Sequence, residues 1–223
     1  MGESLLSLKK ESKKYLQKYS IEDVINPELN YLFILESPHK AEINNGYPVA
    51  GNSGVEMTKF IYYPESNQAF GKLLSNITTY QQHYKGLDEF GVMNVVPAPM
   101  QSSALADDLS TSEKKVVHIL EKLRVNYGAK SHRNQDWNVV KEVLINNFTK
   151  RLNNILLQQE LEYIIPCGKL AQTYLQLVMT SEDLTSTAEI ISGIPHPSRN
   201  QWRQYNSMSK LKAALKENIY FKS

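Results

Sequence analysis

The chain carries the sequence YLFILESPHK at residues 31–40, and this stretch decides the fold that we expect. Its first five residues form a continuous apolar run, whereas a strand with one wet face would alternate apolar and polar residues. The run therefore predicts a parallel strand that is covered on both faces. The polar residues from Glu36 to Lys40 would then stand at the carboxyl end of that strand.

Three further apolar runs have the same character and are predicted to be strands. They are Val92–Val96, Leu161–Ile165 and Ile190–Ile194. Helical patterns lie between the runs, at Ser53–Tyr63, Asn67–Thr79, Ser112–Val125, Trp137–Gln159, Lys169–Met179 and Ser207–Lys216. This alternation predicts an α/β fold, a three-layer α/β/α sandwich around a small, mostly parallel four-stranded sheet.

The length of 223 residues suits a single domain over residues 1–223, in which residues 1–27 form a basic N-terminal helical extension. Hydrophobic residues make up 41% of the chain and charged residues 22%, which excludes disorder on the scale of the whole chain. The net charge of +2 is mildly basic and not that of a histone-like protein. The lysines of the extension either form a solvated helix face or contact a phosphate backbone.

Cysteine usage and hydropathy exclude several classes of protein. A single cysteine, Cys167, excludes a disulfide framework, a cysteine-based zinc site and an iron–sulfur cluster held by the chain's own thiolates. We expect no metal and no cofactor. No apolar run reaches 18 residues and the N-terminus lacks an apolar signal core, so we expect no membrane contact and a cytoplasmic location.

Polar residues follow the predicted strands, at the edge of an open α/β sheet where ligands bind. Glu36 ends the first strand, Asn94 lies in the second, and His196 follows the fourth between two prolines. Each residue alone also has a purely structural interpretation, because a Glu can cap a turn and a His between prolines is often structural. Together they predict a carboxylate, an amide and an imidazole in one crevice.

These motifs resemble, in order and approximate spacing, those of the uracil-DNA glycosylase superfamily. The resemblance spans residues 31–200 and rests on LESPH (35–39), GYPVAGNSG (46–54), MNVVPAP (93–99), IIPCGKLA (164–171) and PHPSRN (195–200). It implies the fold of that family and a monofunctional DNA glycosylase, which flips a base out of the stack and hydrolyses its N-glycosidic bond. The motifs contain no Schiff-base lysine, so we expect no strand cleavage.

The resemblance and the chemistry of the reaction assign roles to three residues. Hydrolysis builds positive charge on the sugar and negative charge on the leaving base. Glu36 is expected to orient the attacking water, and His196 is expected to donate a hydrogen bond to the base as a neutral imidazole. The side-chain amide of Asn94 supplies a donor and an acceptor for the edge of the base.

The resemblance also assigns residues to base binding and DNA binding. Ser37, Val49 and Tyr47 are expected at the base, and His39 either assists catalysis or caps the turn. Trp202 follows the His196 loop where the family inserts a wedge, or else it is a packing aromatic. The expected DNA contacts are Gly168, Lys169, Ser198, Arg199, Asn200 and Trp202.

Val49 departs from the family, which has an aromatic residue there that stacks on the flipped base. Such stacking is worth about 1–3 kcal/mol per base, so its loss weakens the case for plain uracil. It leaves room for a bulky modified pyrimidine, such as one in foreign phage DNA, or for an aromatic supplied by Tyr47, Tyr62 or Tyr63. Repair of a damaged base is the other biological use.

Two other functions remain open. One is a catalytically inactive DNA- or protein-binding member of the same fold. The other is a nucleoside or nucleotide N-glycosidase that uses the same crevice on small molecules. For the leading interpretation we expect a monomer whose partner is single- or double-stranded DNA.

Overall fold

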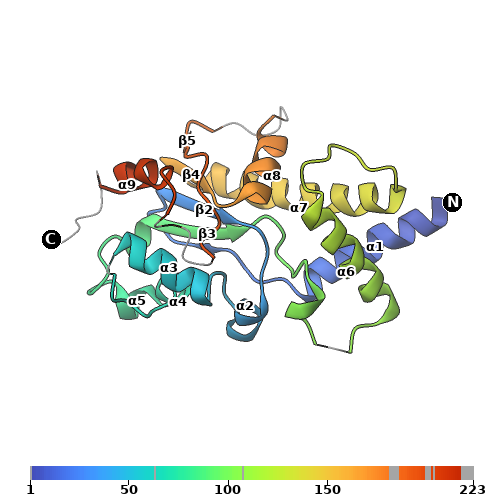
Figure 1. Ribbon diagram of the computed structural model, residues 1–223, viewed down its shortest axis with the longest axis horizontal. Coiled ribbons are helices and arrows are strands. Elements are labelled where there is room, and N and C mark those ends of the chain that lie inside the picture. The colour runs from blue at the N-terminus through green and yellow to red at the C-terminus, as the bar shows by residue number, and fades with distance from the viewer. Residues whose placement is uncertain are drawn as a thin grey trace.

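The computed structural model describes residues 2–62, 64–106, 108–180, 186–198, 202 and 204–216. Within these ranges the fold is α/β, as predicted, and its centre is a five-stranded mixed sheet in the order β1-β3-β2-β4-β5 (Figure 1). The strands are β1 (Val24–Ile25), β2 (Tyr31–Leu35), β3 (Phe90–Asn94), β4 (Tyr163–Pro166) and β5 (Glu189–Ile190). The prediction of a four-stranded, mostly parallel sheet is therefore wrong.

The difference arises at the two edges of the sheet. The strands β3, β2, β4 and β5 run parallel, but β1 pairs antiparallel with β3, with Val24 opposite Val92. Two residues carry no periodic signal, which is why the sequence does not reveal β1. Of the strand expected over Ile190–Ile194, only Ile190 lies in a strand, and both residues of β5 are exposed. A turn that includes Gly193, whose φ is +84°, takes the place of the rest.

Helices cover both faces of the sheet, and Figure 1 shows α3 and α4 on one side of the strands and α7 and α8 on the other. The helices are α1 (Gly2–Lys18), α2 (Lys40–Asn45), α3 (Asn52–Ile61), α4 (Phe70–Ser75), α5 (Ile77–Tyr80), α6 (Thr111–Val125), α7 (Gln135–Gln158), α8 (Lys169–Met179) and α9 (Met208–Lys216). The short 3-10 helices are η1 (Leu87–Glu89) and η2 (Ser102–Ala104). The helix expected over Asn67–Thr79 is divided at Asn76, and α2 is an addition to the sequence prediction.

Alternate residues of β2 enter two different cores, as a strand covered on both faces requires. Leu32 and Ile34 pack with residues of α1, α6, α7 and α8. Phe33 and Leu35 pack with residues of α3, α4 and α9. The apolar run of β2 is therefore continuous because both faces of the strand are buried, as the sequence predicted.

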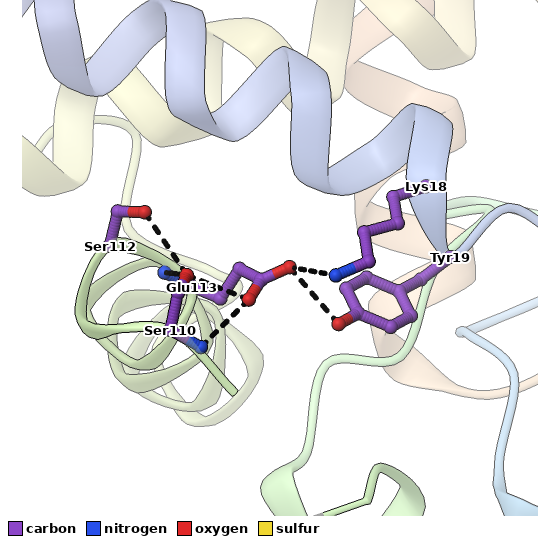
Figure 2. Close-up of polar contacts among 5 residues, drawn as sticks. All are labelled: Lys18, Tyr19, Ser110, Ser112 and Glu113. Atoms are coloured by element: carbon purple, nitrogen blue, oxygen red, sulfur yellow. Dashed lines mark hydrogen bonds and ion pairs between the residues drawn. The ribbon is translucent and has the colours of Figure 1, made fainter. Parts of the chain in front are cut away.

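The N-terminal helix α1 is joined to α6 through Glu113 (Figure 2). The Oε1 atom of Glu113 lies 2.7 Å from Nζ of Lys18 and accepts a hydrogen bond from the hydroxyl of Tyr19 at 3.0 Å. Its Oε2 atom accepts from the main chain and hydroxyl of Ser110, the N-cap of α6, in a capping box. Lys18, one of the basic residues of α1, therefore pairs with a carboxylate within the protein.

Candidate functional site

A cavity of about 710 Å³ opens at the carboxyl ends of β2 and β3. The parallel register places Leu35 opposite Asn94, so both strands end at the same edge. The loop into α3, the helix α6 and the loop after β5 complete the walls. The cavity brings together these residues predicted from the sequence: Glu36, Ser37, His39, Val49, Asn94, His196 and Ser198.

Several predicted residues lie elsewhere. Tyr47 is not among the lining residues that the structure describes, and its ring packs near Gly71. Lys169 is exposed at the start of α8, whereas Gly168 packs against His196. Arg199 and Asn200, and the alternative stacking residue Tyr63, lie outside the described residues.

Trp202 is 1% exposed, so its assignment as a DNA-contacting wedge is wrong. Its ring lies 5.4 Å from that of Phe60 and 6.1 Å from that of Phe33, between ring centroids. The indole nitrogen donates a hydrogen bond to the carbonyl of Pro195 at 2.8 Å. Trp202 is therefore a packing aromatic, and it anchors the residue that precedes His196.

Glu36 forms an ion pair with Arg124, which reaches the cavity from the last turn of α6. The contact joins Oε1 of Glu36 to Nε of Arg124, across 88 residues of sequence. The side chains are 21% and 37% exposed, so the pair is partly shielded from water. Sequence reasoning missed Arg124, because nothing in its helical pattern distinguishes it from a residue on a solvated face.

Burial lowers the pKa of His196 from its ordinary value, although Glu36 opposes this and Arg124 adds to it. At neutral pH the imidazole is therefore neutral and can donate one hydrogen bond. Gly168 has a φ of +92°, and a Cβ there would lie 3.2 Å from the Cβ of His196. The glycine that opens α8 thus makes room for the histidine.

Val49 is buried in the wall of the cavity and has a φ of +47°, which is uncommon and strained for a β-branched residue. Close main-chain contacts with the neighbouring glycines hold Val49 in this conformation. A Cβ at Gly54 would lie 1.8 Å from the carbonyl oxygen of Val49, and one at Gly71 would lie 1.8 Å from that of Pro48. The main-chain nitrogen of Val49 also donates to Oε1 of Glu42 at 2.8 Å.

Asn94 is 2% exposed and is held through its main chain. Arg151 of α7 donates to the carbonyl of Asn94 at 2.7 Å and pairs with both carboxylate oxygens of Asp23 at 2.8 Å. Burial raises the pKa of the Glu42 carboxyl, and the main chain of His39 and Val49 and the side chain of Asn94 oppose this. Among the described residues nothing donates to Oδ1 of Asn94, which is buried at the cavity.

Glu42 and Gln101 also line the cavity and were missed by sequence reasoning. Glu42 is the third residue of α2, and its carboxylate accepts from the main chain of His39 at 2.7 Å. The spacing of His39 and Glu42 is that of a helix N-terminus, but a six-residue helix gives too short a pattern to detect.

Over the described ranges, no three His, Cys, Asp or Glu residues are grouped so that they could hold a metal ion. None of the helices in the described part of the chain has the length and apolar character to cross a membrane. No protein-family model matches the sequence, and a search of curated proteins finds no match.

Proposed function

We propose that the protein is a monofunctional DNA glycosylase with a uracil-DNA glycosylase-like three-layer fold. It would act in the cytoplasm on a modified or damaged base that is flipped out of DNA. The observation that carries this proposal is the presence of Glu36, Asn94 and His196 around one cavity at the carboxyl ends of β2 and β3. The resemblance in sequence motifs supports the same activity.

The roles of these residues follow from where charge develops. The oxygen of water forms a bond to C1′ of the sugar and the water loses a proton to solvent, while the N-glycosidic bond breaks and its electron pair leaves with the base, which takes up a proton from solvent. Glu36 orients the water and stabilises the positive charge on the sugar. The neutral imidazole of His196 donates to the base oxygen as its negative charge grows, and Asn94 binds the edge of the base.

The wall at Val49 supports a substrate larger than uracil. The cavity of about 710 Å³ lies within the range of about 300–1,000 Å³ that is typical of pockets for drug-sized ligands. A small base would leave part of this volume empty and would forfeit dispersion contacts. We therefore propose a bulky modified pyrimidine of foreign DNA, such as phage DNA, as the substrate.

An oligonucleotide panel tests the activity. The bases are uracil, hypoxanthine, xanthine, hydroxymethyluracil, hydroxymethylcytosine and glucosylated hydroxymethylcytosine, in single and double strands, and abasic sites are scored after incubation. We expect abasic sites with at least one enlarged pyrimidine and none with the Glu36→Gln/His196→Ala double variant. Binding to DNA without abasic sites would instead indicate a binding protein, and release of base from free nucleosides would indicate a small-molecule N-glycosidase.

A further inference from the structure

The outer face of α1 carries an open groove of about 360 Å³, which shares no lining residue with the cavity at β2 and β3. This α1 groove is lined by Leu6, Lys9, Lys10, Lys13, Lys14 and Gln17. We propose that the α1 groove binds the phosphate backbone of duplex DNA, next to the stretch from which a base enters the cavity. The identity of this partner rests on the proposed function.

The spacing of the groove residues places them on one face of α1. Leu6, Lys10, Lys13 and Gln17 follow one another at intervals of four, three and four residues, which brings side chains together along a helix. The other two lysines flank this row. None of the lining residues is acidic, so the groove presents charge of a single sign.

Lys10 and Lys13 lie within the row, and both are exposed. Among the residues that the structure describes, no carboxylate forms an ion pair with either lysine. A phosphate can therefore meet these two charges without first displacing a partner within the protein. Lysine is a common contact of the phosphate backbone, because neutralising a phosphate releases counterions from the DNA.

The two flanking lysines pair with carboxylates, but these pairs are largely exposed. Nζ of Lys9 lies 2.7 Å from Oε1 of Glu142, and Nζ of Lys14 lies 2.9 Å from Oε1 of Glu11. Exposed ion pairs contribute little to stability, so a phosphate can replace either carboxylate at small cost. The flanking lysines therefore add to the charge that the row offers to a polyanion.

The opposite face of α1 fixes the helix to the rest of the protein. Leu8, Tyr15 and Leu16 are buried in the core that α1 shares with α6 and α7. The hydroxyl of Tyr15 donates to the carbonyl of Pro99 at 2.8 Å. The lysines therefore stand on a docked helix, and binding does not have to order their main chain.

The same contacts connect α1 to the candidate site. Pro99 belongs to the segment that leaves β3 after Asn94, and α6, on which α1 packs, carries Arg124 into the cavity. Figure 1 shows α1 at the end of the molecule towards which the carboxyl ends of β2 and β3 point. One duplex can therefore reach both the cavity and the α1 groove.

The shape of the groove favours an extended polyanion. From Leu6 to Gln17 the row is about 16 Å long at the rise of an α-helix, and a duplex carries about nine phosphates over that length. A membrane-surface helix would instead expose an apolar face. In α1, Leu6 is the one large apolar side chain that the described structure leaves exposed, because the others face the core.

The salt dependence of binding tests the inference without reference to activity. The full-length protein is titrated into a fluorescently labelled, unmodified duplex of about 20 base pairs, and anisotropy is measured over a series of sodium chloride concentrations. In Lys10→Gln/Lys13→Gln the slope of the logarithm of affinity against the logarithm of salt should decrease in magnitude by about 1.8, since each phosphate contact contributes about 0.9. Lys10→Arg/Lys13→Arg should keep the wild-type slope.

The matched control is Lys210→Gln/Lys212→Gln, which makes the same change of net charge at two exposed lysines of α9, at the other end of the molecule (Figure 1). This variant should keep the wild-type slope. An equal decrease in both variants would show an effect of net charge alone and would overturn the inference. An unchanged slope in Lys10→Gln/Lys13→Gln would show that the face is only solvated.

Two further measurements separate the alternatives. Binding to vesicles of anionic phospholipid that is lost in Lys10→Gln/Lys13→Gln, with an unchanged slope on DNA, would assign the groove to a membrane surface and overturn the inference. Single-turnover excision at saturating protein should be equal in this variant and the wild type, because the lysines touch no reacting atom. Excision with an unchanged slope would contradict the inference alone, whereas a reduced slope without any excision would contradict the proposed function alone.

Discussion

Arg124 and Glu36 form an ion pair inside the cavity although 88 residues separate them in the chain. The pair joins the last turn of α6 to the residue that follows β2. The carboxylate proposed to orient water is therefore held through Oε1, and its direction depends on its contact with α6.

Replacement of Arg124 by alanine should slow the chemical step about tenfold or more, because the partly buried carboxylate of Glu36 loses its partner and its fixed direction. Single-turnover rates at saturating protein measure this effect. Arg124→Lys should recover part of the rate, since it restores the charge. Lys122→Ala, an exposed change on the same helix, serves as the control, and an equal loss in that variant would contradict a specific role for the pair.

Replacement of His196 by alanine should lower the single-turnover rate by about 10²–10³, the usual cost of removing one donor to a developing anion. DNA affinity, measured by fluorescence anisotropy, should change little because the hydrogen bond strengthens only in the transition state. His118→Ala on the exposed face of α6 is the matched control. A wild-type rate in His196→Ala would place the chemistry elsewhere.

Replacement of Val49 by phenylalanine should reduce the volume of the base pocket. The ratio of the rate on an enlarged pyrimidine to the rate on uracil should then fall, because the ring fills space that the larger base needs. Val49→Ala keeps the pocket open and should preserve the ratio. A wild-type protein that excises uracil efficiently and rejects every enlarged base would refute this use of the pocket.

Replacement of Glu113 by glutamine should lower the free energy of unfolding by about 1 kcal/mol at pH 7, since it weakens a capping box and the contact with Lys18. The pKa of Glu113 in the folded protein is lowered to about 2, first by Lys18 and then by Ser110. A lowered carboxyl pKa stabilises the folded state above the unfolded value of about 4.3, and this stabilisation disappears as the pH falls towards 2.

Urea unfolding of the wild type and of Glu113→Gln therefore should differ at pH 7 and converge as the pH falls from about 4.3 to 2. Glu3→Gln, an exposed change in the first turn of α1, the helix that carries Lys18, should show no such convergence. A difference for Glu113→Gln that stays constant across this range would show that its carboxylate does not carry the contact drawn in Figure 2.

The sequence by itself determined the elements whose signal is local. The apolar run at Tyr31–Leu35 is a strand with the predicted bounds, and the helix Lys169–Met179 also has the predicted bounds. The strand is visible as a continuous apolar run and the helix as a 3.6-residue period, because in both cases the burial of each residue follows from its place in its own element. Since parallel strands end at one edge, the sequence also placed Glu36, Asn94 and His196 together.

Only the tertiary structure decided the rest, because those features depend on contacts between distant segments. A two-residue strand such as β1 exists through its pairing with β3, and Trp202 is buried through its packing on Phe33 and Phe60. Arg124 and Glu42 belong to the cavity because the fold brings α6 and α2 to the end of the sheet. A local sequence pattern indicates whether a residue is exposed or buried. It does not indicate which distant charged residue will contact it.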